Sequence, residues 1–349
     1  MHYFCTYFDK NYLTRGLCLY KSLVRHCTDF RLYALCLDDE SYRHVQEFSY
    51  EKLIAIAAEE LEQADPKLAE AKTNRAKVEY YFTCSPCLPL YLLDRFPKIE
   101  NITYLDADLY FFSSPEPIFQ ELEGYSIGII EHRLPPYRRH QLKNGIYNVG
   151  WLTFRNDANG RMCLQWWRDA CIEWCGETHR EDGKYTDQAY LDDWPERFEK
   201  VRTIAHIGAN AAPWNIENYA VHYWGGAVWI GDKPLIFYHF HALRRITSWL
   251  YHSGFGKLRT KMRLTLRRHV YLPYIEELEE FSRAGLLPER VRNIEARLSL
   301  GKRFIRSLCI PLLDIYYGAH VFVVRRPGNA VALGGVVTQQ HQKSSMPDS

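Results

Sequence analysis

A stretch of strand-forming residues near the middle of the chain, Ile102 to Phe112, limits the folds available to it. Most of its residues are apolar or aromatic, which is typical of a strand buried in a core. Two carboxylates, Asp106 and Asp108, interrupt the stretch, and burying a carboxylate is costly unless a partner offsets its charge. In an extended strand both side chains would point the same way, with the small Ala107 between them. The stretch therefore predicts a core strand with an acidic pair at its end, after which apolar residues resume.

This acidic pair has two interpretations. A divalent metal ion would offset both charges, because hard cations bind carboxylate oxygens and leave coordination positions open for substrate phosphates. Alternatively, the two acids cap the following turn or pair with Lys or Arg, which is common for a short Asp-x-Asp sequence. The apolar run before the pair and the aromatic run after it favour the metal site.

Short apolar runs alternate with segments of helical periodicity in the first 200 residues. Strands are predicted at 2–8, 31–37, 53–58, 125–131 and 146–154, and helices at 13–26, 59–72, 75–96 and 158–176. Strands that alternate with helices form mainly parallel sheets covered on both faces. Ligands of such sheets bind beyond the carboxyl ends of the strands. The helix at 75–96 is expected to be disturbed near Pro86 and Pro89.

Several enzyme classes are disfavoured by motifs that the sequence lacks. No Gly-x-Gly-x-x-Gly follows the first strand and no Gly-x-x-x-x-Gly-Lys-Ser/Thr occurs, which argues against dinucleotide-dependent dehydrogenases and P-loop enzymes. The chain opens without the pattern of a secretory signal, so its ten cysteines favour reduced thiols in a cytosol. Cys84-x-x-Cys87 has no second pair at zinc-site spacing, and we expect it to be structural.

Polar residues also interrupt two later segments. The strand at 146–154 contains Asn148, and its Gly150 suggests a close approach of backbone or ligand. A helix is expected to begin at Tyr185, which places Asp187 and Gln188 in its first turn. There they either complement the helix dipole or project into a pocket.

The apolar run at 234–241 ends in two histidines, His239 and His241, and Arg244 and Arg245 follow it. A neutral imidazole can complete the shell of a metal ion. A guanidinium can hold a diphosphate through paired hydrogen bonds. A single histidine at the end of a strand is usually a core residue, but in a chain that already has an acidic pair each of these groups has a use.

Six short blocks, taken in order after the first strand and its loop, carry a resemblance to a known family. The blocks are Tyr104-Leu105-Asp106-Ala107-Asp108, Tyr147-Asn148-Val149-Gly150, Asp187-Gln188, Trp214-Asn215, Lys233-Pro234-Leu235 and Tyr238-His239-Phe240. Together they resemble glycosyltransferase family 8 and related bacterial transferases of surface polysaccharides, over residues 2–250. The resemblance implies an α/β, Rossmann-like GT-A fold with a mainly parallel mixed sheet flanked by helices and a helical C-terminal appendage.

The resemblance also implies roles for individual residues in binding the donor. Asp106, Asp108 and His239 would hold Mn²⁺ or Mg²⁺ on the diphosphate of a nucleotide-diphospho-sugar, with a UDP-sugar favoured. Asn148, Asp187 and Gln188 would line the donor sugar at the reacting face.

Other residues correspond to the base, ribose and diphosphate sites of the family. Thr6, Tyr7 and Tyr12 fall in the loop that holds the base and ribose. Arg245 stands six residues past the metal histidine, where the family commonly has a Lys on the diphosphate. Lys77 is expected to supply a further cation, with Arg75 as the alternative, because Ser85-Pro86 stands where relatives often have Lys-Pro. A second departure is Ala242, which occupies the position of an expected Gly.

The activity that the resemblance implies is metal-dependent transfer of a sugar to a hydroxyl of a glycan, a lipid-linked saccharide or a protein. Retention of the anomeric configuration is the outcome expected in family 8, whereas an inverting enzyme would need a carboxylate base aimed at the acceptor. Two other readings stay open. One is a degenerate fold that only binds a nucleotide or glycan, and the other is a metal phosphohydrolase, which would normally need more acids or histidines near Asp106.

The C-terminal part differs in charge from the rest of the chain. We expect a catalytic domain at 1–250, a basic and largely helical extension at 251–335 and a disordered tail at 336–349. Residues 257–306 contain 13 Lys and Arg and 6 Glu. Such a segment would suit either peripheral contact with an anionic membrane, at the inner face of the cell membrane, or packing on the catalytic domain. Nucleic-acid binding is not expected, because no recognised module accompanies the basic residues.

Overall fold

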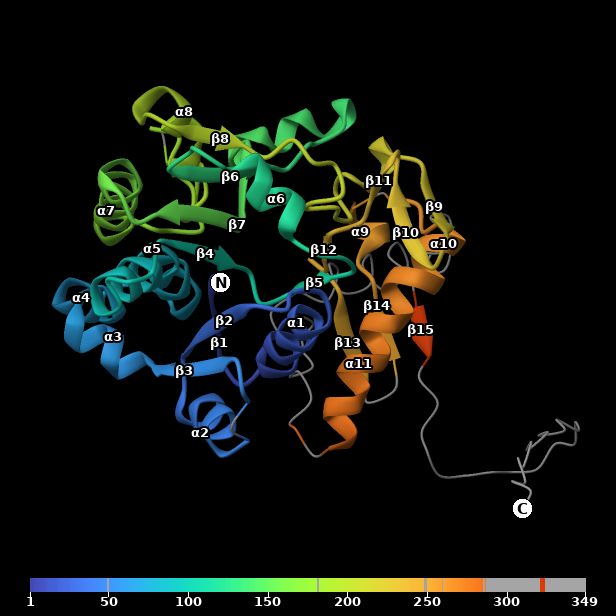
Figure 1. Ribbon diagram of the computed structural model, residues 1–349, viewed down its shortest axis with the longest axis horizontal. Helices are drawn as coiled ribbons and strands as arrows, with labels where there is room; N and C mark the ends of the chain where they lie inside the picture. Colours follow the sequence, from blue (N-terminus) through green and yellow to red (C-terminus); the bar gives the residue numbers. More distant parts are fainter. Residues whose placement is uncertain are drawn as a thin grey trace, which may run out of the picture.

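The computed structural model describes residues 1–286, apart from residues 49, 181, 248, 249, 259 and 285, together with residues 321–323. A seven-stranded sheet in the order β3-β2-β1-β4-β7-β6-β8 forms its centre (Figure 1). Its strands are β1 (His2–Phe8), β2 (Phe30–Cys36), β3 (Leu53–Ala57), β4 (Asn101–Leu105), β6 (Ile127–Glu131), β7 (Tyr147–Arg155) and β8 (Val201–Thr203). Only β7 runs antiparallel to its neighbours β4 and β6, so the predicted mainly parallel mixed sheet is confirmed.

Side chains of β1 contribute to two separate apolar cores, one on each face of the sheet. Phe4 and Phe8 pack in the core that contains α1 (Leu13–His26). Cys5 and the partly buried Tyr7 pack in the other, with α5 (Lys77–Arg95) and α7 (Ala158–Glu173). Successive side chains of a strand point to opposite faces, so one short strand serves both cores.

Three prolines have effects on helices that differ from the prediction: two lie within a continuous helix, and one begins a new helix. Helix α5 continues through Pro86 and Pro89, and both prolines are buried within it. The single helix expected at 59–72 is instead two helices, α3 (Ala58–Ala64) and α4 (Pro66–Thr73). Asp65 lies between them and accepts a hydrogen bond from the Leu68 N–H at 3.3 Å. Pro66 takes the first position of α4, where its missing N–H costs nothing.

Shorter elements connect these parts and extend the fold toward the C-terminus. In the first part they are α2 (Asp39–Glu47), β5 (Leu109–Phe111), α6 (Glu116–Glu121), η1 (Pro136–Asn144), η2 (Ala189–Asp193), α8 (Trp194–Arg197) and η3 (Ile216–Asn218). In the second part they are β9 (Val221–Trp224), β10 (Ala227–Ile230), β11 (Lys233–Pro234), β12 (Phe237–His239), β13 (Arg244–Thr247), β14 (Leu250–His252), α9 (Phe255–Leu258), α10 (Leu264–Leu266), the short π-helix η4 (Arg267–Tyr271), α11 (Leu272–Arg283) and β15 (Val321–Val323).

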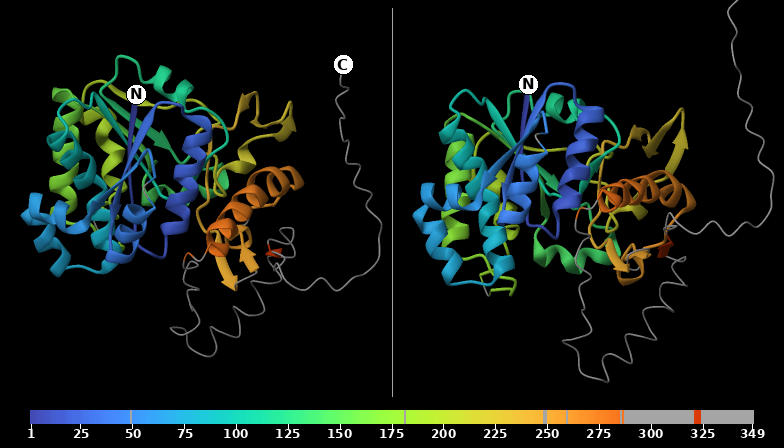
Figure 2. Two further views of the ribbon diagram at one scale, coloured as in Figure 1. Left: turned by 60° about the horizontal axis from the view of Figure 1, so that its bottom comes forward. Right: turned by 90° about the horizontal axis from the view of Figure 1, so that it is seen from below.

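Helix α11 packs against α1, as Figure 2 shows from two sides. Glu277 of α11 accepts hydrogen bonds from Arg25 of α1 and, at 2.5 Å, from the Tyr110 hydroxyl. Lys21 of α1 lies 3.4 Å from the same carboxylate. Residues 264–283 of the predicted extension are therefore helical, as expected, and α11 packs on α1, whereas β14 and β15 form strands within the same predicted extension. The predicted tail at 336–349 lies outside the described residues.

The described part of the chain contains no helix that is both long enough and apolar enough to cross a bilayer.

Candidate active site

The acidic pair lies in the turn that connects β4 to β5. Strand β4 ends at Leu105 and β5 begins at Leu109, so the two acids follow the end of a core strand, as predicted. The Leu109 N–H donates to the Asp106 carbonyl at 3.2 Å and closes the turn. The turn, and not the alternation of a strand, therefore presents the two carboxylates at the edge of the sheet.

His239 reaches this turn from the far end of the chain. It ends β12, whose antiparallel pairing with β5 places His239 opposite Leu109. Beyond the strand, the Phe240 N–H donates to the Asp108 carbonyl at 3.0 Å. His239 Nε2 consequently lies 3.0 Å from Asp108 Oδ1 and 3.6 Å from Asp106 Oδ2. One ligand atom from each residue lies within 4.8 Å of the others.

These three side chains strongly affect one another's charge. Burial, together with the neighbouring Asp108, raises the pKa of Asp106 to about 6. Burial alone would also raise the pKa of Asp108, but the hydrogen bond and charge of His239, with Arg15, hold that pKa below its usual range. Burial would lower the pKa of His239, and the two carboxylates outweigh it and raise the pKa. Two carboxylates and one imidazole that converge in this way are a donor set suited to Mn²⁺ or Mg²⁺.

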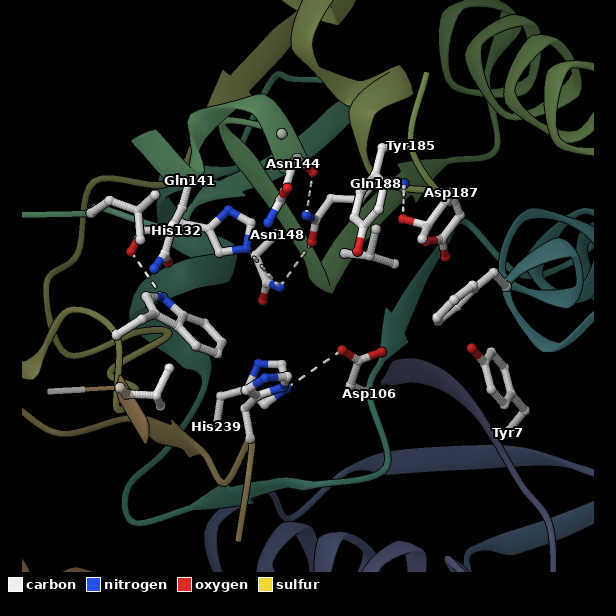
Figure 3. A pocket seen from close by; sticks show the side chains of 18 residues that line it. Tyr7, Asp106, His132, Gln141, Asn144, Asn148, Tyr185, Asp187, Gln188 and His239 are labelled. Carbon is white, nitrogen blue, oxygen red and sulfur yellow. Dashed lines mark hydrogen bonds and ion pairs between the residues drawn. The ribbon is translucent and has the colours of Figure 1, made fainter. Parts of the chain in front are cut away.

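A cavity of about 350 Å³ opens beside the cluster. Figure 3 shows Asp106 and His239 pointing toward each other, with Asn148, Gln188 and Asp187 across the cavity from them. The lining residues are Tyr7, Phe82, Asp106, His132, Leu134, Gln141, Asn144, Gly145, Asn148, Val149, Tyr185, Thr186, Asp187, Gln188, Trp214, His239, His241 and Leu258. Its volume falls at the small end of the range for ligand pockets.

A chain of amides fixes one wall of this cavity. Gln188 Nε2 donates to the Asn144 carbonyl at 2.7 Å, and Asn148 Nδ2 donates to Gln188 Oε1 at 3.4 Å. Asn148 Oδ1 accepts from the Gly150 N–H at 3.2 Å. A Cβ on Gly150 would lie 2.6 Å from Asn148 Oδ1 and 3.0 Å from His239 Nδ1. Glycine is thus needed where the amide wall meets the cluster of Asp106, Asp108 and His239.

Asp187 is a buried carboxyl group on the same wall. Burial, with the charge of Asp106, raises its pKa to about 7. The helix predicted to begin at Tyr185 begins instead at Ala189, and it is a short 3₁₀ turn. Thr186 has a φ of 47°, and its hydroxyl accepts from the Gln188 N–H at 3.4 Å. A turn therefore aims Asp187 and Gln188 into the cavity, where the sequence had predicted the first turn of a helix.

Four of the residues predicted to bind the donor do not line this cavity. Thr6 is fully buried, and Tyr12 is exposed at the start of α1. Lys77 is exposed, and its Nζ lies 3.3 Å from Asp9 Oδ2. Arg245 is buried, and its Nη2 lies 3.1 Å from Glu279 Oε1 of α11. Of the predicted base and diphosphate residues, Tyr7 and Asp106 are the ones that the cavity includes.

Sequence reasoning missed Arg15, in the first turn of α1. Its side chain is fully buried, with Nη1 3.6 Å from Asp108 Oδ2 and a hydrogen bond from Nη2 to the Leu243 carbonyl at 2.5 Å. The guanidinium thus lies behind the acidic pair, away from the cavity lining. The signal in the sequence that could have indicated Arg15 was the presence of a cationic residue shortly after the first strand.

His132 opens the polar stretch 132–143, which the sequence leaves open between a substrate loop and a solvated loop without assigning His132 a role. Burial lowers its pKa to about 4. The Trp214 indole N–H and the Asn215 amide both donate to the His132 carbonyl, at 3.0 and 2.9 Å. The Trp214 ring packs edge-on against the rings of His132 and His239. Trp214 and Asn215 therefore position a neutral imidazole beside His239.

Comparison with known proteins places the chain in a recognisable group. The model of the family described as "Glycosyl transferase family 8" matches residues 5–192. The uncharacterized protein YfnD of Bacillus subtilis (strain 168) is 34% identical over 287 residues, which cover 80% of this chain and 89% of YfnD. YfnF of the same organism is 32% identical over 252 residues, which cover 70% of this chain and 82% of YfnF.

A solved structure shares the fold. It is the galactosyltransferase LgtC, in complex with donor and acceptor sugar analogues, at a TM-score of 0.51 and 15% sequence identity. The match covers 82% of this chain and 100% of that chain. At this identity the likeness shows the fold alone.

Proposed function

This chain belongs to glycosyl transferase family 8 and is a glycosyltransferase, and from that premise we propose that it moves a sugar from a nucleoside diphosphate to a hydroxyl acceptor with a divalent metal ion. The observation that carries the proposal is the convergence of Asp106, Asp108 and His239 at the edge of the cavity. A cation held there would neutralise the charge that develops on the leaving diphosphate. Mn²⁺ and Mg²⁺ both suit these ligands, and a UDP-sugar is the donor that we favour.

The protein's own groups would hold the acidic pair in place. Arg15 lies behind Asp108, and the Tyr104 hydroxyl donates to Asp106 Oδ1 at 3.0 Å. Each carboxylate is thus held by a neighbour that does not itself line the cavity. Such fixed ligands lose little freedom when a metal ion binds, which favours tight and specific binding.

The amide wall and Asp187 would position the donor sugar. Asn148 and Gln188 are held by hydrogen bonds within the protein, so they present a fixed polar surface to a sugar ring. Asp187 is our first choice for stabilising the positive charge that develops on the sugar, and Gln188 is the second. Groups that are already oriented before the reaction stabilise such charge at little cost in reorganisation.

We propose that the reaction retains the anomeric configuration, with the departing phosphate accepting the proton of the acceptor hydroxyl. The carboxylates that line the cavity are Asp106 and Asp187, and the first belongs to the metal cluster. If the enzyme were inverting instead, Asp187 would have to be its general base, and the raised pKa of Asp187 would suit that role. Nuclear magnetic resonance of the first-formed product distinguishes the two, because an inverted anomer would contradict retention.

A panel of nucleotide sugars tests the donor and the metal together. Thermal unfolding is followed with each nucleotide sugar, with and without Mn²⁺, and mass spectrometry follows release of the free sugar. One nucleotide sugar is expected to raise the melting temperature only when Mn²⁺ is present and to be hydrolysed slowly. Stabilisation without any hydrolysis or transfer would favour a protein that only binds a nucleotide or glycan. A panel without any metal-dependent shift would contradict the proposed site.

The predictions for Thr6, Tyr12, Lys77 and Arg245 concern the base and the diphosphate. Lys77 and the Tyr81 hydroxyl both contact Asp9 Oδ2, at 3.3 and 3.2 Å. This cluster is next to the loop after β1 and would suit a hydroxyl-rich group such as ribose. Arg245 would need to leave Glu279 to reach a diphosphate. We therefore propose that Arg15, which lies beside Asp108, is the cation nearest to the bound metal ion.

A further inference from the structure

An aromatic hairpin projects from one end of the molecule (Figures 1 and 2). Strands β9 and β10 pair antiparallel and are joined by Gly225 and Gly226. The two glycines have φ of +59° and +81°, the left-handed conformation that a two-residue hairpin turn requires. The residues just before the turn are Tyr223 and Trp224. Large aromatic side chains are therefore placed at the tip of a tight, well-defined turn.

These side chains face solvent. Trp224 is 70% exposed, the highest fraction among the large hydrophobic residues that the structure describes, and Tyr223 is 48% exposed. Leu264 of the adjacent α10 is also exposed. Exposed apolar side chains that gather in one place usually mark an interaction surface.

The elements beside the hairpin are basic. Residues 260–272 contain Lys261, Arg263, Arg267 and Arg268 and no Asp or Glu. Arg263 donates to the Tyr219 carbonyl at 3.1 Å, and the His269 ring stacks on Tyr223 with ring centres 3.8 Å apart. These contacts fix the basic segment against the base and one strand of the hairpin. Aromatic residues and cations thus share one end of the molecule.

We propose that this end, defined by Tyr223, Trp224, Leu264, Arg263 and Arg268, binds the surface of an anionic lipid bilayer. Trp and Tyr favour the headgroup region of a membrane, where an apolar ring and a polar N–H or O–H are both accommodated. Lys and Arg are attracted by the negative potential of anionic lipids. A stable protein interface would instead need about 800 Å² of complementary surface on each partner. The exposed large hydrophobic residues found here are three side chains, which suits shallow insertion into a bilayer.

This surface is connected to the cavity by short segments. Leu258 lines the cavity, and Thr260, two residues later, donates its hydroxyl to the Pro213 carbonyl at 2.7 Å. Trp214, next to Pro213, also lines the cavity. Docking through the hairpin would therefore hold the cavity near the lipid surface, where an acceptor anchored in the membrane could reach it. The consequence for the acceptor rests on the proposed function, whereas the binding of lipid does not.

Co-sedimentation of the full chain with lipid vesicles tests the proposal. The vesicles contain phosphatidylcholine alone or mixed with phosphatidylglycerol, at low and at high salt. The variants are Trp224→Ser and Arg268→Glu, and Phe48→Ser is the matched control because Phe48 is 61% exposed and follows α2. We expect binding to the mixed vesicles only, weakened by salt, about fivefold weaker or more in either hairpin-end variant and unchanged in Phe48→Ser.

Two outcomes would overturn the proposal. One is the absence of binding to the anionic vesicles, and the other is binding that neither hairpin-end variant weakens. Self-association that Trp224→Ser abolishes, without vesicle binding, would assign the hairpin to a protein interface instead. Metal-dependent hydrolysis of the donor in solution should be the same in Trp224→Ser and in the unmodified chain. That measurement separates failure of membrane binding from failure of the proposed function.

Discussion

His239 Nε2 lies 3.0 Å from Asp108 Oδ1, although the two residues belong to distant parts of the sequence. Their strands form a two-stranded ladder, in which His239 pairs with Leu109 and the Phe240 N–H reaches the Asp108 carbonyl. The cluster of Asp106, Asp108 and His239 is therefore held together by backbone hydrogen bonds between β5, β12 and the turn before β5. Sites supported by strands are positioned more precisely than sites on loops.

Replacing Asp108 by Asn should remove most of the response to metal. If the unmodified chain binds Mn²⁺, a concentration of 100 times its Kd stabilises it by about 2.7 kcal/mol. Asp108→Asn removes one of the two carboxylate ligands, so the variant should lose most of the stabilisation by Mn²⁺. Urea unfolding with Mn²⁺ and with a chelator measures it, and Asp232→Ala, an exposed acid between β10 and β11, is the control. An equal Mn²⁺ effect in Asp108→Asn would show that the ion binds elsewhere.

Gly150→Ala should damage the site without removing any ligand. The added Cβ would come within 2.6 Å of Asn148 Oδ1 and 3.0 Å of His239 Nδ1, so the amide or the imidazole must move. We expect weaker Mn²⁺ binding and at least about tenfold lower transfer activity, because small displacements of positioned groups are costly in catalysis. The melting temperature without metal provides the comparison. A variant that unfolds early but keeps its affinity for Mn²⁺ would contradict the prediction.

Asp187→Asn should change how stability depends on pH. The folded pKa of Asp187 is raised to about 7, so the stability contributed by its protonated form is present below about pH 4 and is lost as the pH rises through 7. The Asn variant lacks this loss. Its free energy of unfolding relative to the unmodified chain should increase between pH 4 and 7, by up to about 4 kcal/mol. Urea unfolding in chelator at several pH values measures the difference, and a difference that is constant with pH would refute the assigned pKa.

Arg15 and Asp108 should be energetically coupled. Arg15→Met removes a buried cation beside a carboxylate and a donor to the Leu243 carbonyl, and it should cost about 3 kcal/mol of unfolding free energy. In Asp108→Asn the carboxylate charge is gone, so the same change should cost less, with a coupling of about 1 kcal/mol or more. Urea unfolding of the two single variants and the double variant measures it. Costs that simply add would show that Arg15 acts on the packing of α1 and not on the acidic pair.

Local patterns were enough to predict the framework of the fold. The strand at 2–8 and the helix at 13–26 match β1 and α1 to the residue, because their apolar periodicity is strong and their ends are marked by polar residues. The glycosyltransferase family also followed from short blocks in a fixed order. Both depend on residues that are close together in the sequence.

The site could be predicted only in part, because some of its contacts are set by distant elements. Arg245 was expected at the diphosphate, yet it lies against Glu279 of α11, a helix whose position the sequence near Arg245 does not indicate. Arg15 was missed for the same reason, since the Asp108 carboxylate beside it comes from a turn far along the chain. Which face a short strand or helix presents to the site depends on tertiary packing that single-sequence patterns do not contain.

The pairing of β12 with β5 also has a consequence for how the protein is made. All seven strands of the central sheet lie before residue 204, but the imidazole of His239 is synthesised later, with β12. A nascent or truncated chain would thus have both aspartates at an open edge and no complete cation site. The candidate cation site would therefore be completed only after β12 is synthesised and pairs with β5.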